Sequence, residues 1–160
     1  RGRGFDMEIL YNDPVRQPEA EAELGATWVS LDELYARSDF ISVNCALTES
    51  SRHMIGREAI AKMKNTAVIV VSARGGIVDE AALYEALTTG KLGAAGLDVF
   101  EEEPVDPKAP LLQLENVALS PHLGTSVQET RVKMAVTAAE DVIRVLRDEA
   151  PAYPLFKLSA

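Results

Sequence analysis

From residue 67 the chain reads Ala67-Val68-Ile69-Val70-Val71-Ser72-Ala73-Arg74-Gly75-Gly76, an apolar run of strand length followed by a turn-forming cluster. The same order returns in Gly93-Ala94-Ala95-Gly96-Leu97-Asp98-Val99-Phe100-Glu101-Glu102-Glu103-Pro104 and in Val117-Ala118-Leu119-Ser120-Pro121-His122-Leu123-Gly124. In an open α/β sheet, ligands bind just beyond the carboxyl ends of the strands. An arginine, acidic residues and a histidine at three such ends are therefore expected to converge on one small molecule, as in an active site.

Strand-like and helix-like segments alternate along the chain, and this alternation predicts βαβ units. We expect capped helices with Ser30, Asp79 and Ser126 as N-caps and Gly25 and Gly90 as stops. The sequence therefore predicts an α/β fold with a doubly wound, mainly parallel sheet of the Rossmann type. The expected strands are 7–11, 27–29, 39–46, 67–71, 93–99 and 116–119, and the expected helices are 19–24, 31–37, 56–63, 80–89 and 126–147.

One part of such a fold is absent from these 160 residues. A dinucleotide-binding fold begins with a strand and a Gly-x-Gly-x-x-Gly loop, and Arg1–Phe5 does not satisfy that pattern. Because the first strand is central in a doubly wound sheet, the strands at 7–11 and 39–46 are not expected to join without it. We therefore expect a partial dinucleotide-binding domain over 1–148, an extended tail over 149–160, and a longer parent protein.

Composition narrows the class of protein. The net charge of −9 argues against a general nucleic-acid binder, which needs a basic face. No apolar run approaches the ~20 residues that span a bilayer. One cysteine and two histidines make a metal site improbable, and a reducing, cytoplasmic location is the default expectation. We expect Cys45 to be a small buried residue and His53 to be structural or exposed. The apolar stripe of the last helix is expected in the core.

Three ordered motifs carry a resemblance to a known family. They are Ala73-Arg74-Gly75-Gly76-x-Val78-Asp79-Glu80, Gly96-Leu97-Asp98-Val99-Phe100-x-x-Glu103-Pro104 and Ser120-Pro121-His122-Leu123-Gly124. Together they resemble the NAD-binding domain of the D-isomer-specific 2-hydroxyacid dehydrogenases, most of all the glyoxylate/hydroxypyruvate reductase branch, with D-3-phosphoglycerate dehydrogenase a near relative. The resemblance implies that the last helix leads back toward a substrate domain, which lies outside this sequence.

The resemblance assigns residues to roles. It implies that Arg74 binds the substrate carboxylate, that His122 is the catalytic acid/base, and that Glu103 is its partner. It also implies that Asp13 reads the adenosine ribose and that Asp98 lies near the nicotinamide carboxamide. Ala46 stands where the family usually has proline. The residues that it places at the cofactor are Asp13, Cys45, Ala46, Thr48, Ala73, Arg74, Asp98, His122 and Gly124.

These residue types suit the reduction of a small 2-keto acid to a D-2-hydroxy acid. Imidazole titrates near neutral pH and can supply the proton, while a guanidinium matches a carboxylate with two hydrogen bonds. Asp13, at the end of the second strand of such a fold, favours NAD because a carboxylate repels a 2′-phosphate. Arg16, three residues later, can instead attract that phosphate, so NADP stays open.

Several alternatives remain at this point. Glyoxylate and hydroxypyruvate are the expected substrates, and D-3-phosphoglycerate dehydrogenase is the second enzymatic reading. A formate dehydrogenase is disfavoured because that branch pairs its histidine with glutamine, where Glu103 stands here. A dinucleotide-sensing binding protein, like the C-terminal-binding corepressors, has the same fold. The resemblance further implies a homodimer, and the net charge and the short apolar runs predict no nucleic-acid or membrane partner.

Overall fold

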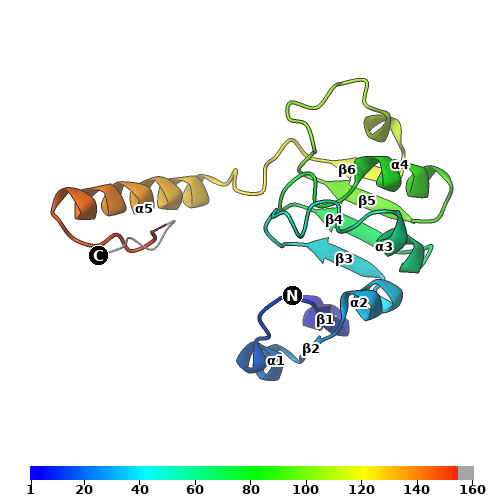
Figure 1. The fold of residues 1–160 in the computed structure, drawn as a ribbon, viewed down its shortest axis with the longest axis horizontal. Helices are drawn as coiled ribbons and strands as arrows, with labels where there is room; N and C mark the ends of the chain where they lie inside the picture. The colour runs from blue at the N-terminus through cyan, green and yellow to red at the C-terminus, as the bar shows by residue number, and fades with distance from the viewer. Residues whose placement is uncertain (155–160) are drawn as a thin grey trace. The chain divides into compact units, whose positions relative to one another are not determined.

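The computed structural model describes residues 1–154 and divides into two compact units, Arg1–His122 and the segment from Leu123 onward. The first unit contains two parallel sheets (Figure 1). In the part of the chain that the structure describes, strands β1 (Ile9–Tyr11) and β2 (Ala26–Trp28) pair with each other, and a separate sheet has the order β3-β4-β5-β6. Its strands are Phe40–Val43, Val68–Val71, Ala94–Leu97 and Val117–Leu119.

The break between β1 and β3 lies where the sequence predicts it. All strand pairs run parallel, as in Ile69 beside Ala95 and Leu97 beside Leu119. A central first strand would lie between β1 and β3 in a doubly wound sheet. The observed fold is therefore a parallel α/β sheet of the Rossmann type without that strand.

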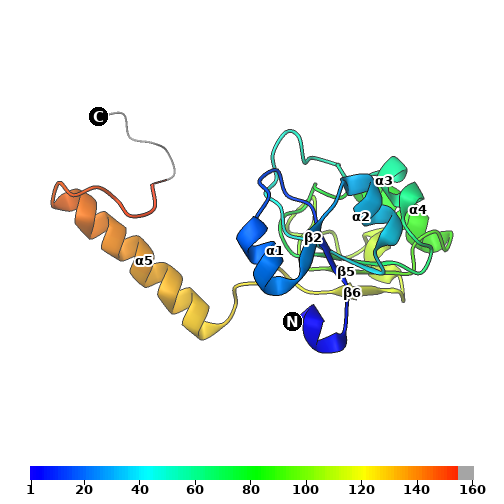
Figure 2. The same ribbon diagram turned by 90° about the horizontal axis from the view of Figure 1, so that it is seen from below.

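Helices cover one face of the larger sheet (Figure 2). Helix α3 (Arg57–Lys62) packs between α2 (Leu31–Arg37) and α4 (Glu80–Thr88), and strands β3, β4 and β5 bury alternate side chains. On the opposite face, Phe40 and Val70 are exposed. The remaining elements are α1 (Pro18–Leu24) and the 3₁₀ helices Gly2–Phe5 and Pro110–Gln113.

The core lies between the four-stranded sheet and this helical layer. Each fully buried large aliphatic side chain there contributes about 1.5–3 kcal/mol relative to an exposed one. The most deeply buried side chains are Ile55, Ile69, Ile77, Leu83 and Leu92.

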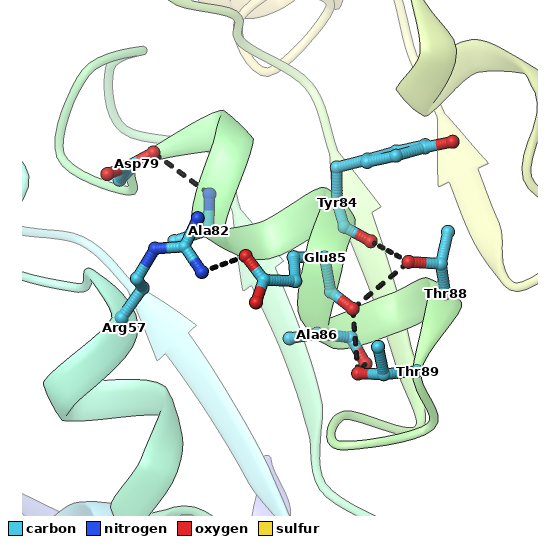
Figure 3. Close-up of polar contacts among 8 residues, drawn as sticks. All are labelled: Arg57, Asp79, Ala82, Tyr84, Glu85, Ala86, Thr88 and Thr89. Atoms are coloured by element: carbon cyan, nitrogen blue, oxygen red, sulfur yellow. Dashed lines mark hydrogen bonds and ion pairs between the residues drawn. The ribbon is translucent and has the colours of Figure 1, made fainter.

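Helix α4 follows the sequence expectation closely. Its apolar face, Ala82, Leu83, Ala86 and Leu87, is buried, and the Asp79 carboxylate accepts a hydrogen bond of 3.0 Å from the backbone N–H of Ala82 (Figure 3). Arg57 on α3 forms an ion pair with Glu85 on the exposed side. The capping by Ser30 is also observed, since its hydroxyl accepts from the Glu33 N–H.

The second unit contains helix α5 (Gln128–Leu146). Ser126 is not its N-cap: Val127 occupies that position, and the Ser126 hydroxyl accepts a hydrogen bond from Arg131 instead. The prediction of a buried stripe is wrong as well, because Val132, Ala135, Val136, Ala139, Val142, Ile143 and Leu146 are all exposed.

The reason for that exposure is local. A helix buries an apolar stripe only against another element. Within its own unit, α5 is contacted by the short segment after it, where the N–H groups of Ala152 and Tyr153 donate to Asp141. Part of the expected tail, residues 155–160, lies outside the described residues. No helix within 1–154 has the length and apolar character needed to cross a membrane.

Candidate active site

The carboxyl ends of β4, β5 and β6 bring the predicted catalytic loops to one edge of the sheet. Arg74 follows β4, Glu103 follows β5, and His122 follows β6. These strands are parallel neighbours in the sheet, so their ends meet at the same edge. The three catalytic residues predicted from separate motifs therefore lie on adjacent loops.

His122 and Glu103 are in direct contact. The ring Nδ1 of His122 lies 2.8 Å from Oε2 of Glu103. Because a carboxylate only accepts, Nδ1 carries the hydrogen, and Nε2 is the nitrogen through which the ring can exchange a proton. The other carboxylate oxygen accepts the Phe100 N–H at 3.0 Å. Both side chains are partly open to solvent, with 46% of His122 and 38% of Glu103 exposed.

The backbone fixes the position of the histidine. His122 adopts a left-handed conformation, with φ of 56°, and its N–H donates to the Asp98 carbonyl at 2.9 Å. This bond attaches the loop after β6 to the loop after β5. Asp98, which the resemblance places near the nicotinamide, is partly buried, and its own N–H donates to the Val71 carbonyl at the end of β4.

The contacts around Glu103 stabilise its charged form. The hydrogen bond from His122 is the main cause that lowers the pKa of the Glu103 carboxyl, followed by the bond from the Phe100 N–H. The positive charge of Arg74 contributes in the same direction. Glu103 is therefore ionised at neutral pH and holds the histidine ring in one orientation.

Arg74 is exposed, and its Nη1 donates to the carbonyl of its neighbour Ala73 at 2.7 Å. Its loop lies directly against the loop that carries Glu103. A Cβ atom on Gly75 would lie only 1.7 Å from the carbonyl oxygen of Phe100, so only glycine allows this approach. Gly76 has φ of 79°, which also favours glycine. The two glycines thus set the separation between the arginine and the histidine–glutamate pair.

A pocket of about 710 Å³ opens beside these loops, at the ends of β3 and β4. Four residues that the resemblance places at the cofactor are on its wall. Cys45 is exposed there, so the expectation that it would be buried is wrong; it lies beyond the last residue of β3 and outside the helical layer. The lining residues are Asn44, Cys45, Ala46, Leu47, Ser72, Ala73 and Arg74.

A serine that the sequence analysis did not single out holds the pocket wall in place. The Ser51 side chain is buried, and its hydroxyl donates to the Ala46 carbonyl at 2.7 Å. The same oxygen accepts the Thr48 N–H at 2.7 Å. These two bonds close a short turn and define the course of the loop where the family's usual proline is replaced by Ala46. A local Thr-x-x-Ser pattern is the signal that could have indicated it.

Three further cofactor candidates are not among the residues that line this pocket. Asp13 follows β1 and is exposed, with its Oδ1 accepting the Val15 N–H at 2.8 Å. Thr48 is not among the lining residues, and its hydroxyl lies 3.0 Å from that of Ser50. Gly124 belongs to the second unit. The structure therefore brings together the nicotinamide-side candidates but leaves Asp13 on the smaller sheet.

A second histidine–glutamate contact lies close to the first. Nε2 of His53 is 3.1 Å from Oε1 of Glu101, and that same oxygen accepts the Glu80 N–H at 2.9 Å. Glu80 in turn accepts the Glu101 N–H at 2.6 Å. Burial is the main cause that raises the pKa of the Glu80 carboxyl. Within residues 1–154, no cluster of three or more potential metal ligands was found.

The residues present fit part of a dinucleotide. Parallel strands whose carboxyl ends meet at a pocket, and an acidic residue after β1, are features with which a Rossmann-type fold contacts the nicotinamide and the adenosine ribose. The glycine-rich loop that would bind the phosphates is absent from the sequence. Fold and site together define a dinucleotide-binding domain of the dehydrogenase class.

The family follows from comparison with known proteins. Residues 1–124 match the family model described as D-isomer specific 2-hydroxyacid dehydrogenase, NAD binding domain. The chain belongs to this family, which confirms the resemblance and the NAD-binding character of the fold.

Curated relatives carry related names. A glyoxylate reductase of Korarchaeum cryptofilum is 49% identical over 151 residues, which cover 94% of this chain and 46% of that protein. A glyoxylate/hydroxypyruvate reductase B of Erwinia tasmaniensis is 48% identical over 143 residues, covering 89% of this chain and 44% of that protein. The chain thus spans about half the length of the curated relatives it matches.

Solved structures agree with the fold. A glyoxylate reductase from Paecilomyes thermophila has a TM-score of 0.89 and 39% identity, over 98% of this chain and 47% of that one. A D-lactate dehydrogenase with NAD+ from Lactobacillus jensenii has a TM-score of 0.88 and 29% identity, over 97% of this chain and 50% of that one. These matches support the parallel, Rossmann-type architecture.

Proposed function

We propose that the full-length protein containing this chain reduces a small 2-keto acid, glyoxylate or hydroxypyruvate, to the D-2-hydroxy acid with NADH. The observation that carries the proposal is the contact of 2.8 Å between His122 and Glu103, on a loop that packs against the loop of Arg74. A proton donor, its anionic partner and a carboxylate-binding cation are the groups that this reaction requires. The relatives' names support the same substrate class.

Each residue has one task in this proposal. The nicotinamide, when bound, supplies the hydride. His122, as the imidazolium, gives a proton from Nε2 to the carbonyl oxygen of the substrate and becomes neutral; Glu103 holds Nδ1 and stabilises the imidazolium before the transfer. Arg74 turns from the Ala73 carbonyl to the substrate carboxylate, which it binds with two hydrogen bonds. We assign Asp98 and the pocket residues Cys45, Ala46 and Ala73 to the nicotinamide side of the cofactor.

The other cofactor candidates and the assembly complete the proposal. Asp13 binds the adenosine ribose, and Thr48 and Gly124 belong to the cofactor-facing loops. The protein acts as a homodimer in the cytoplasm, as the resemblance implies for this family.

The test uses the purified full-length protein with NADH and a panel of glyoxylate, hydroxypyruvate and 3-phosphohydroxypyruvate. We expect turnover of the first two and its loss in His122→Ala. Preference for the phosphorylated acid would support the phosphoglycerate dehydrogenase reading instead. A folded protein that binds NADH and reduces none of the three would be a dinucleotide-sensing protein, and the proposed reaction would be wrong.

A further inference from the structure

The structure gives Arg16 a partner that bears on the choice between NAD and NADP. Arg16 lies three residues after Asp13, in the connection between β1 and α1. Its Nε is 2.7 Å from Oε1 of Glu21, and its Nη2 is 2.8 Å from Oε2. The guanidinium thus faces both oxygens of one carboxylate, the fork geometry in which arginine binds carboxylates and phosphates most specifically.

Glu21 is anchored to the sheet as well as to the arginine. The hydroxyl of Tyr11, the last residue of β1, donates to Oε1 of Glu21 at 2.6 Å, and the Gln17 N–H donates to the same hydroxyl at 2.9 Å. Only 14% of the Glu21 side chain is exposed, compared with 63% of the Arg16 side chain. Hydrogen bonds from Arg16 and then Tyr11 lower the pKa of the Glu21 carboxyl to about 2. The carboxylate is therefore charged at every physiological pH.

This contact changes what a 2′-phosphate would meet after β1. In Rossmann-type folds an acidic residue there binds the ribose hydroxyls of NAD, whereas a nearby arginine accommodates the 2′-phosphate of NADP. Here the arginine already faces a carboxylate with two of its nitrogens. A 2′-phosphate would have to displace Glu21 from Arg16. Otherwise it would approach a site where the two negative charges of Asp13 and Glu21 exceed the single positive charge of Arg16.

We infer that Glu21 is a specificity-determining residue for the cofactor: it neutralises Arg16 and holds it in place, and so excludes NADP in favour of NAD. The inference rests on the proposed function, because it assumes that the full-length protein uses a nicotinamide cofactor. Its readout is nucleotide affinity, which can be measured separately from turnover. Glu21 acts through Arg16 and is a positioning residue in this role.

The experiment measures NAD+ and NADP+ binding to the full-length protein by titration calorimetry, with kcat/KM for NADH and NADPH as a second readout. In Glu21→Gln, which keeps an acceptor for Tyr11, we expect the NADP+ to NAD+ affinity ratio to rise about tenfold, the size of one charge-assisted hydrogen bond. Glu23→Gln removes the same charge from the same helix without touching the Arg16 contact and is the matched control. Arg16→Gln combined with Glu21→Gln should return the ratio to that of the parent.

The outcomes separate this inference from the proposed reaction. An equal change in Glu21→Gln and Glu23→Gln would show a general charge effect and overturn the inference. The inference would also be overturned if Arg16→Gln weakened NADP+ binding by the same factor in the parent protein as in the Glu21→Gln variant. A shifted binding ratio without turnover of any 2-keto acid would uphold the role of Glu21 and contradict the reaction. Turnover with an unchanged ratio would do the reverse.

Discussion

Two histidine–glutamate contacts involve glutamates of the same short segment, Glu101 and Glu103, and they differ in the ring nitrogen that they use. His122 contacts Glu103 through Nδ1, and His53 contacts Glu101 through Nε2. Both histidines have left-handed backbones, with φ of 56° and 50°. Their side chains are similarly exposed, at 46% and 42%. Exposure and backbone conformation therefore do not distinguish His122, the proposed catalytic histidine, from His53.

The ring nitrogen that contacts the glutamate does distinguish the two histidines. With Nδ1 bound to Glu103, the outer nitrogen of His122 remains for a substrate. With Nε2 bound to Glu101, the outer nitrogen of His53 is used to join loops. That loop contact is reinforced because Glu101 also accepts the Glu80 N–H, and the His53 N–H donates to the Gly76 carbonyl at 2.8 Å. We interpret His122 as the proton donor in the His122–Glu103 pair. We interpret His53 as a structural contact that supports this pair.

The largest expected difference is in turnover. His122→Ala should lower kcat of the full-length enzyme by about 10²–10⁴, the usual contribution of general acid–base catalysis, with NADH affinity nearly unchanged. His53→Ala removes only a partly exposed histidine–carboxylate contact, worth at most about 1 kcal/mol, so its kcat should stay close to that of the parent. Steady-state kinetics and NADH titration of both variants test this. Equal losses of kcat would erase the distinction between the two contacts.

The next effect concerns the close packing between the Arg74 loop and the loop that carries Glu101 and Glu103. Gly75→Ala places a Cβ against the Phe100 carbonyl and must push the Arg74 loop away from the Glu103 loop. Overpacking of this kind costs about 1–3 kcal/mol, and we expect the upper part of that range because backbone atoms cannot rotate away. The KM for the 2-keto acid should rise as well.

Urea unfolding and steady-state kinetics measure these two effects. Gly96→Ala is the control, since its Cβ would meet Val70 at an ordinary 3.6 Å. A Gly75→Ala protein as stable as the Gly96→Ala protein would show that the loops separate freely.

Local patterns were sufficient for the strands of the sheet and for the N-caps of α2 and α4. The β-branched run of β4 and the alternation of apolar segments depend on residues that are neighbours in sequence, and so does the capping of α4 by Asp79. Patterns of this range predicted the parallel α/β fold and the break between β1 and β3. Element ends differ from the prediction by one to a few residues, because fraying and loop contacts set them.

Contacts between distant residues were beyond such patterns. Composition does not separate Glu103 from Glu101 and Glu102; the family resemblance selected it, and the structure shows its contact with His122. The His53–Glu101 contact joins residues 48 positions apart, and no local signal announces it. The stripe of α5 has helical periodicity, but periodicity does not say what covers it. The Ser126 hydroxyl, similarly, is bound by Arg131 instead of the helix N-terminus.

A smaller effect tests the supporting role of the second contact. Glu101→Gln keeps an acceptor for the Glu80 N–H but removes the carboxylate charge that faces His53. We expect a loss of about 0.5–1 kcal/mol in the free energy of unfolding and a change in kcat/KM of a few-fold at most. Glu102→Gln, in the next position and exposed, should change neither quantity. Indistinguishable unfolding curves for the two variants would remove the supporting role from Glu101.

The smallest expected effect is a pair of opposite pH dependences. His122 lowers the pKa of Glu103, so this contact stabilises the fold above the ordinary carboxyl range and is lost as pH falls through the folded-state pKa. Burial raises the pKa of Glu80, so protonation of that carboxyl relieves a penalty as pH falls. As pH falls from about 7 to about 3, the stability of the parent should therefore rise first relative to Glu80→Gln and then, below the ordinary carboxyl pKa, fall relative to Glu103→Gln.

Urea unfolding at several pH values measures both differences, each below about 1 kcal/mol because the groups are partly exposed. Slopes of the same sign would mean that the two carboxylates experience one common electrostatic environment. Opposite slopes would separate them physically: Glu103 is kept charged by its contact with His122, whereas Glu80 is partly buried beside the Glu101 backbone.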